Sequence, residues 1–147
     1  MISISMTGLP PSSNHAYFNL PRGGRVLSKG GKGYKTSVSS FVTQHHHSNI
    51  RDVKSNWPYG LAIKLTFEEL YNATWPTKAA NRYKKVDVSN RVKLLEDALV
   101  DSLGIDDSQM IAVFVMKELG PSEMTHVVVW DYEVEQMDNA IRHVRSL

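Results

Sequence analysis

The sequence contains no cysteine. This absence excludes disulfide frameworks, thiolate zinc sites, iron–sulfur clusters and a cysteine nucleophile, so any metal must be bound by oxygen or imidazole ligands. Long apolar runs are also missing, because no stretch approaches the roughly 20 apolar residues of a membrane span. The amino terminus lacks the basic segment, apolar core and small-residue cleavage site of a secretory signal. We therefore expect a cytoplasmic protein.

Acidic residues are scarce in the first part of the chain. Residues 1–85 contain 12 Lys and Arg against 3 Asp and Glu, whereas residues 86–147 contain 5 against 12. An asymmetry of this size favours a basic surface for a polyanion beside an acidic cluster that holds cations. The alternative is that folding intersperses the two sets on one neutral surface. The charges alone leave both interpretations open.

With 147 residues, 41% of them apolar, the chain is expected to form one globular domain, residues 1–147, with a buried core. Alternating apolar residues predict strands at 1–6, 61–67, 110–119 and 125–134, the last two joined as a hairpin across 120–122. Helical spacing predicts helices at 28–42, at 88–103 with Gly104 as a stop, and at 134–147. This order predicts an α/β (α+β) fold with a mixed sheet of about four strands and helices packed on it.

Acidic residues lie at both ends of the helix predicted at 88–103. Asp87 lies where a long basic connection, residues 68–85, meets the helix, and Asp106 and Asp107 lie where the next strand begins. Such a helix is roughly 20 Å long, so these carboxylates meet only if the chain after Gly104 doubles back. If they converge, they form a hard oxygen site suited to Mg²⁺ or Mn²⁺. Lys93 would then offer a cation to the charge that develops on a phosphodiester.

The same residue types also suit ordinary structural roles. Asp87, Ser89 and Asn90 can each cap a helix start, because their short side chains accept bonds from free N–H groups. Lys93 stands four residues before Asp97, which is the spacing of a surface ion pair. The adjacent acids after the helix suit a polar turn. Spacing alone does not separate these roles from a metal site.

Four short motifs nevertheless occur together in a recognisable order. They are Asp87-Val-Ser-Asn90, Lys93, Asp97-Ala-Leu99 and Ile105-Asp-Asp-Ser-Gln-Met110. Near the amino terminus they are preceded by Pro10-Pro-Ser-Ser-Asn14, a basic segment and Ser28. This arrangement resembles the RusA family of Holliday-junction resolvases, whose central motif reads Asp-x-Asp-Asn, then Lys, then Asp-Ala-Leu, then Asp-Asp-x-Gln before a strand. The resemblance covers about residues 1–132 and leaves the helix at 134–147 outside the recognised motif.

The resemblance implies a homodimeric, Mg²⁺-dependent endonuclease that cuts four-way DNA junctions symmetrically in recombination and repair. By this resemblance Asp87 takes the place of the family's first metal-binding aspartate, Asp107 that of its last, and Lys93 that of its essential lysine. Asn90 matches the motif's asparagine and is expected to orient the site, while Asp106 is expected to assist as a metal ligand. Two sites related by a two-fold axis match two symmetric cuts, which is why a dimer suits this reaction.

Ser89 departs from the family motif, which has a second aspartate at this position. A hydroxyl can coordinate Mg²⁺ but supplies no charge, so metal affinity should be weaker. Asp97 and Asp106 are candidates to compensate. The alternative function is a branched-DNA binding protein without turnover, in which Ser89 marks a decayed site. A third possible function is that of a structural or regulatory phage protein with neither activity.

Two basic segments interleaved with aromatic residues are expected to contact DNA phosphates and unstacked bases. Their cationic residues are Arg22, Arg25, Lys29, Lys32, Lys35, Lys78, Arg82, Lys84 and Lys85. Solubilising surface charge is the alternative for each. Trp75 in the long connection could stack on DNA, whereas Trp130 is expected in the core or at a dimer interface.

Two further patterns invite a site interpretation. His45, His46 and His47 would point about 100° apart on a helix, so they cannot all bind one ion, and solvated side chains are expected. Gly30-Gly-Lys-Gly33 lacks the spacing of a phosphate loop and the Ser or Thr after its lysine. This departure argues against an NTPase.

Overall fold

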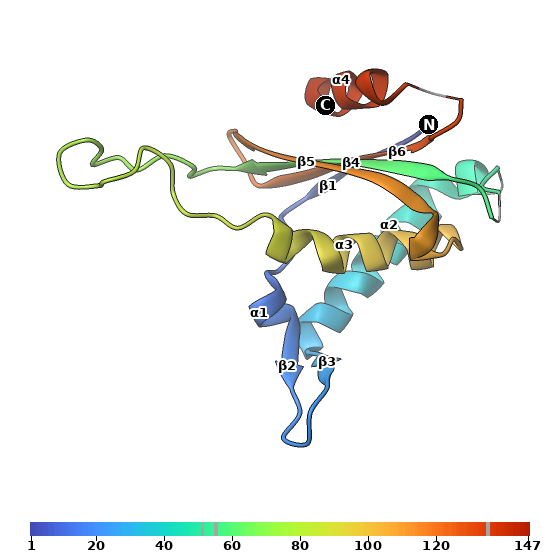
Figure 1. Cartoon of the computed structure of the whole chain (residues 1–147), viewed down its shortest axis with the longest axis horizontal. Coiled ribbons are helices and arrows are strands. Elements are labelled where there is room, and N and C mark those ends of the chain that lie inside the picture. The colour runs from blue at the N-terminus through green and yellow to red at the C-terminus, as the bar shows by residue number, and fades with distance from the viewer. Residues whose placement is uncertain (51, 55, 135) are drawn as a thin grey trace.

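A four-stranded mixed sheet forms the centre of the molecule in the computed structural model, which describes residues 1–50, 52–54, 56–134 and 136–147, with only the backbone at 47–50 (Figure 1). The sheet order is β1–β6–β4–β5, with β1 at Ile2–Thr7, β4 at Tyr59–Phe67, β5 at Met110–Leu119 and β6 at Met124–Asp131. A separate hairpin consists of β2 (Tyr17–Asn19) and β3 (Arg25–Leu27). The helices are α1 (Ser13–Ala16), α2 (Lys29–Ile50), α3 (Ser89–Leu103) and α4 (Met137–Ser146), with a 3₁₀ turn, η1, at Asp107–Gln109. The predicted mixed α+β fold is confirmed.

Helices cover both faces of the sheet, as Figure 1 shows. On one face α2 and α3 pack against the sheet, and Ile63 of β4 and Leu99 of α3 are fully buried in this cluster. On the other face α4 packs its Val144 against Trp130 of β6. Trp130 therefore belongs to the core. Because both faces are covered, β4 is buried along its whole length.

The predicted hairpin between residues 110–119 and 125–134 is wrong. β4 lies between β5 and β6, and it pairs parallel with β5 and antiparallel with β6. A strand that is buried on both faces is favoured at the centre of a sheet, so β4 displaces the pairing expected from proximity in the chain. The connection at 120–123 can cross β4 because four extended residues reach about 13 Å, whereas two strand spacings are about 9.6 Å.

α2 begins as the sequence predicts, directly after Ser28. The Ser28 hydroxyl accepts a hydrogen bond from the Gly31 N–H at 3.0 Å. A β-carbon at Gly31 would lie 2.4 Å from the carbonyl oxygen of Ala16. Glycine weakens a helix in isolation, but here it allows α1 and α2 to pack closely. This contact joins the β2–β3 hairpin to the body of the molecule.

α3 also begins and ends where its pattern indicates. Its apolar stripe, which includes Leu95 and Leu103, is buried. Gly104 adopts a left-handed conformation with φ of 68°, and its N–H binds the Val100 carbonyl. Such a conformation is one that glycine adopts without steric cost, so the helix stops there.

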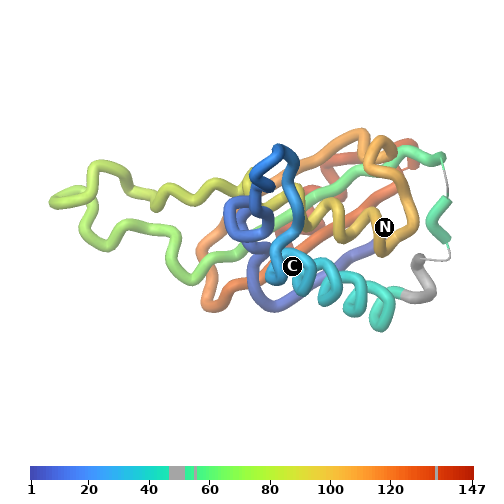
Figure 2. Tube along the Cα trace, turned by 90° about the horizontal axis from the view of Figure 1, so that it is seen from below, coloured from blue at the N-terminus to red at the C-terminus, as the bar shows by residue number. Residues whose placement is uncertain are grey.

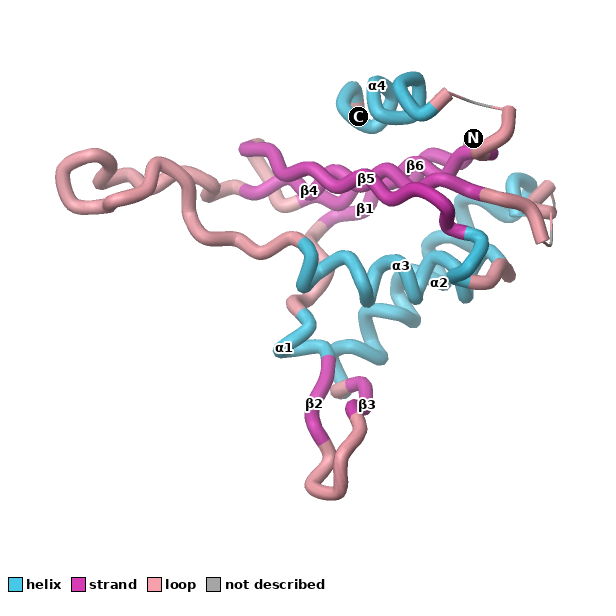
Figure 3. Tube along the Cα trace, viewed as in Figure 1, coloured by secondary structure: helices cyan, strands magenta, loops and turns pink. Residues whose placement is uncertain are grey.

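Two segments project from the body in different directions. The β2–β3 hairpin extends beyond α1, and the connection between β4 and α3 extends past the end of the sheet (Figures 1 and 2). Figure 3 shows that this connection is loop throughout. The sequence did not predict α1 or the hairpin, because three-residue strands are too short to show alternation. No helix in the described part of the chain is long and apolar enough to cross a membrane.

Candidate active site

Asp87 lies just before α3 and binds the first turn of this helix. One of its oxygens accepts hydrogen bonds from the Ser89 N–H at 3.0 Å and the Ser89 hydroxyl at 2.6 Å. The other oxygen accepts from the side-chain amide of Asn90 at 2.5 Å. The bond from the Ser89 hydroxyl holds the pKa of Asp87 below its ordinary value. Asp87 is therefore an exposed carboxylate whose orientation two motif residues maintain.

The start of α3 also contacts the amino-terminal motif. The Ser13 hydroxyl donates to the side-chain oxygen of Asn90 at 3.1 Å. The Arg91 guanidinium donates to the carbonyl of Pro10 at 2.5 Å. Two stretches about 80 residues apart in sequence thus meet, and the Asn90 amide is oriented on both sides.

Lys93 lies one turn further along α3 and faces two carboxylates. Its ammonium nitrogen is 2.8 Å from Asp97 Oδ1 and 4.0 Å from Asp107 Oδ2. The hydrogen bond to Asp97 raises the pKa of Lys93, so this side chain is cationic at neutral pH. Tyr17 of the β2–β3 hairpin donates its hydroxyl to the second Asp97 oxygen at 3.3 Å. Tyr17 was not predicted as a site residue, and no local sequence signal identifies it.

Asp106 and Asp107 have different surroundings although they are adjacent. Asp106 accepts from the N–H and the hydroxyl of Ser108 at 2.9 and 2.5 Å, while Gln109 accepts from the Asp106 N–H. This capping box holds η1, and the Ser108 hydroxyl lowers the pKa of Asp106. Asp107 approaches Lys93 instead. The chain after Gly104 therefore doubles back, which was the condition for these carboxylates to meet, and it brings Asp107 to within 4.0 Å of Lys93.

Asp87 and Asp107 nevertheless lie beside different turns of α3. Asp87 accepts hydrogen bonds from Ser89 and Asn90 of the first turn, whereas Asp107 approaches the ammonium group of Lys93. Mg²⁺ binds oxygen at about 2.1 Å, so two ligands of one ion lie at most about 4 Å apart. Among the described residues, no group of three or more His, Asp or Glu side chains could hold a metal ion. The structure therefore shows these motif carboxylates separately, each with its own contacts, and not as one cluster of metal ligands.

A shallow apolar groove runs between α3 and the edge strand β5, beside these carboxylates. This α3–β5 groove has a volume of about 260 Å³ and is lined by Val88, Ser89, Val92, Lys93, Glu96 and Val115. Burial raises the pKa of Glu96, and the negative charges of Asp97 and Asp107 act in the same direction. Beyond the groove, β5 exposes Ile111 and Val113, at 56% and 44% of their surface. The motif residues therefore border an uncovered apolar surface.

The order and placement of these residues agree with a comparison against known families. A family model for the endodeoxyribonuclease RusA matches residues 8–129. The chain belongs to the RusA family. This family consists of nucleases that resolve Holliday junctions, so the chain is assigned to DNA-acting nucleases. A comparison with curated proteins finds no match.

The RusA match includes the amino-terminal motif and every predicted residue from Asp87 to Asp107, and it ends before α4. The predicted DNA-binding residues fall on the two projecting segments and the start of α2 (Figure 2). Lys35 pairs with Asp101 at 2.5 Å, and Lys84 pairs with Glu69. The other predicted cations are exposed: Arg22, Arg25, Lys29, Lys32, Lys78, Arg82 and Lys85.

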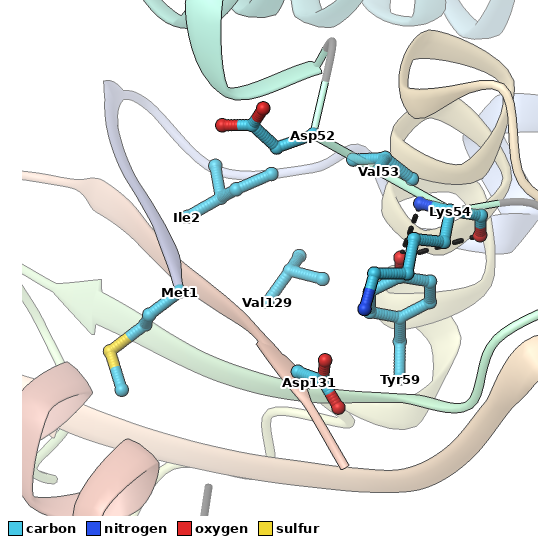
Figure 4. Close-up of a pocket in the computed structure, with 8 residues that line it drawn as sticks. All are labelled: Met1, Ile2, Asp52, Val53, Lys54, Tyr59, Val129 and Asp131. Carbon is cyan, nitrogen blue, oxygen red and sulfur yellow. Dashed lines mark hydrogen bonds between the residues drawn. The ribbon is translucent and has the colours of Figure 1, made fainter. Parts of the chain in front are cut away.

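Two other features lie apart from the RusA motif residues. His45 stacks on Phe41 with ring centroids 4.2 Å apart, and the His47 side chain lies outside the described residues. A cavity of about 210 Å³ lies where β1 begins and β6 ends, and Figure 4 shows the carboxylates of Asp52 and Asp131 around it. None of its lining residues belongs to the predicted site. This cavity therefore gives no support to a second interpretation of the active site.

Proposed function

We propose that the chain is a Mg²⁺-dependent endonuclease that resolves four-way DNA junctions by paired, symmetric phosphodiester cleavage in recombination and repair. The observation that carries this proposal is the placement of two exposed motif carboxylates, Asp87 and Asp107, beside one groove that Lys93 lines. A bound Mg²⁺, or Mn²⁺, would activate water and stabilise the leaving oxygen. The cytoplasmic location expected from the sequence stays a prediction.

In this proposal a second copy of the chain completes each metal site. A two-fold axis beside the α3–β5 groove would place α3 antiparallel to its copy, so that Asp87 of one chain faces Asp107 of the partner subunit. Such an isologous contact would bury Val88, Val92 and Val115 together with the exposed edge of β5. Long, apolar, uncovered edge strands are uncommon in monomers, which supports this face as the interface.

The remaining motif residues receive roles from their contacts. Lys93 would place its ammonium group near the scissile phosphate, because it already lies within 4.0 Å of Asp107. Asn90 would hold the Asp87 carboxylate in orientation. Ser89 donates to Asp87, so we assign it to supporting that carboxylate rather than to replacing the family's second anionic ligand. Asp106 would assist by positioning Asp107 through η1.

Subunit mixing tests the shared site. Asp87→Asn and Asp107→Asn homodimers should each fail to cleave a labelled four-way junction in Mg²⁺. After co-refolding of equal amounts, half of the dimers contain one chain of each variant. Each of these mixed dimers holds one intact site of two, so about a quarter of all sites should be able to nick the junction. If both carboxylates acted within one chain, no mixture would nick. Asp138→Asn, on an exposed acid of α4 outside the RusA match, is the control and should cleave normally.

Ser89 supports the alternative of a branched-DNA binding protein without turnover, since it removes one negative charge from the motif. Ser89→Asp restores that charge and should strengthen Mg²⁺ binding. Cleavage by the wild-type chain that Asp87→Asn abolishes would favour the enzyme. Tight junction binding without product in Mg²⁺ or Mn²⁺, with cleavage gained by Ser89→Asp, would favour the alternative.

A further inference from the structure

The connection between β4 and α3 forms a projecting arm, which we define as residues 70–83. Its base is closed by a bridge between Tyr71 and Tyr83 and by a hydrogen bond from the Lys84 N–H to the Leu70 carbonyl. Within it, the Asn72 side chain donates to the carbonyls of Asn81 and Tyr83. The arm extends past the end of the sheet (Figures 1 and 2). These bonds make it an organised structure and not merely a polar linker.

Three aromatic side chains of the arm gather around one guanidinium group. Tyr71, Trp75 and Tyr83 leave 41%, 45% and 48% of their surface exposed. The Arg82 guanidinium carbon lies 5.7 Å from the ring centroids of Tyr71 and Trp75 and 5.8 Å from that of Tyr83. The two tyrosine rings are 5.1 Å apart. The cluster thus presents flat, polarisable surfaces to solvent, away from the core.

The charge of the arm indicates what this surface binds. Residues 70–83 contain Lys78 and Arg82 and no Asp or Glu. Aromatic faces with adjacent cations suit a ligand that combines flat rings with negative charge. Duplex DNA offers the charge but keeps its ring faces stacked inside the helix. Unpaired nucleotides offer both.

We propose that the arm is a stacking site for unpaired bases of DNA, in which Trp75 stacks on a base, Arg82 supports the aromatic cluster and Lys78 contacts a phosphate. This inference rests on the proposed function for its substrate, since a branch point in DNA is where bases lose their stacking partners. It adds a binding site separate from the Asp87–Lys93–Asp107 residues. That separation allows the two proposals to be tested independently.

Tryptophan fluorescence provides a direct measurement. Trp130 is 1% exposed and the indole nitrogen of Trp57 is buried, so Trp75 is the exposed tryptophan of the three. The full-length chain is titrated with an oligothymidylate and with a duplex of equal length, in EDTA so that no cleavage occurs. Oligothymidylate should quench Trp75 emission, whereas duplex should leave it nearly unchanged. Unchanged emission at saturating oligothymidylate would overturn the inference.

Variants separate stacking from charge. Trp75→Ala should weaken binding of a dye-labelled oligothymidylate roughly 5- to 100-fold, as expected when one base loses its aromatic partner, whereas Trp75→Phe should keep most of the affinity. Lys78→Gln should weaken the binding of single-stranded and duplex DNA alike. It should also reduce the salt dependence of binding by about one phosphate contact. Equal losses for both DNA forms in Trp75→Ala would indicate a phosphate-binding surface only and contradict stacking. Circular dichroism confirms that each variant is folded.

The active site supplies the last control. Asp87→Asn should lose junction cleavage but bind oligothymidylate as the wild type does. If the chain fails to cleave any junction while Trp75 quenching persists, the proposed function fails and the stacking site stands. If cleavage occurs without quenching, the stacking site alone is contradicted.

Discussion

At the residue scale, the side chains proposed to act in catalysis also make ordinary structural contacts. Asp87 binds the first turn of α3, and Lys93 pairs with Asp97 at the spacing of an ordinary helix ion pair. These interactions leave both side chains able to make further contacts. A carboxylate has several acceptor positions, and the Lys93 ammonium group also approaches Asp107. The structural roles instead hold these groups in orientation.

The hydrogen bond from Ser89 should control the titration of Asp87. Because this bond stabilises the ionised form, the pKa of Asp87 lies below its ordinary value. The contribution of the ionised carboxylate to stability is therefore present at higher pH and is lost as the pH falls through the lowered pKa. Ser89→Ala should move this pKa upward, measured by NMR of the carboxyl carbon. The matched variant Ser108→Ala should instead raise the pKa of Asp106, because the hydrogen bond from the Ser108 hydroxyl is the main cause of its lowered pKa. A Ser89→Ala spectrum with Asp87 unmoved would refute this role.

Lys93 should act on the reaction more than on DNA binding. Lys93→Gln removes the cation while the exposed position leaves the fold intact. We expect single-turnover cleavage of a saturating four-way junction to slow roughly 10²- to 10³-fold, the usual effect of removing one group that stabilises transition-state charge. Lys85→Gln, on an exposed cation outside the groove, should change the rate little. Similar losses in both variants would mean that Lys93 only attracts DNA.

At the element scale, helix packing explains residues that local propensity does not. α2 carries Gly30, Gly31 and Gly33 in its first turns, which is unfavourable for an isolated helix. Gly31 meets the backbone of α1, whereas the space around Gly33 is open. Only one of these two glycines is therefore required by tertiary contact.

Opposite effects are expected at these two positions. Gly31→Ala should destabilise the chain by about 1–3 kcal/mol, because a β-carbon 2.4 Å from a carbonyl oxygen forces the helices apart. Gly33→Ala should stabilise it by about 0.5–1 kcal/mol, since alanine restricts the unfolded chain more than glycine. Urea unfolding of both variants measures the difference. A Gly31→Ala variant as stable as the wild type would mean that α1 shifts freely.

At the scale of the whole molecule, the sheet ends on one side in an uncovered strand. β5 is ten residues long, pairs only with β4 among the described strands, and is bordered by the α3–β5 groove. The projecting arm and the β2–β3 hairpin both extend away from the sheet (Figure 3). An interface here would join two sheets and two α3 helices in one contact.

A charge on this edge should separate the subunits. Val113→Lys places an ammonium group at the proposed interface, so sedimentation velocity should show a shift from dimer to monomer, with loss of junction cleavage. Val134→Lys is the matched control, because Val134 is also exposed, at 73%, but lies outside β5 and the groove. A wild-type chain that sediments as a monomer at cleavage-competent concentrations would exclude the shared metal site.

The sequence by itself determined the features that depend on neighbouring residues. The apolar period of α3, its stop at Gly104 and the alternating apolar residues of β4 are local patterns, and the sequence predicts each of these elements. That β4 is buried on both faces was not predicted. The motifs that carry the RusA resemblance are also local in sequence. These features follow from backbone geometry and side-chain burial over a few residues.

Only the tertiary structure decided which distant segments meet. It inserted β4 between β5 and β6, brought Tyr17 to Asp97, and placed Asp107 beside Lys93 and on a different turn from Asp87. Such choices depend on which faces the complete chain can bury together, because pairing and packing energies are summed over all elements at once. A pattern read along one segment holds no information about that sum.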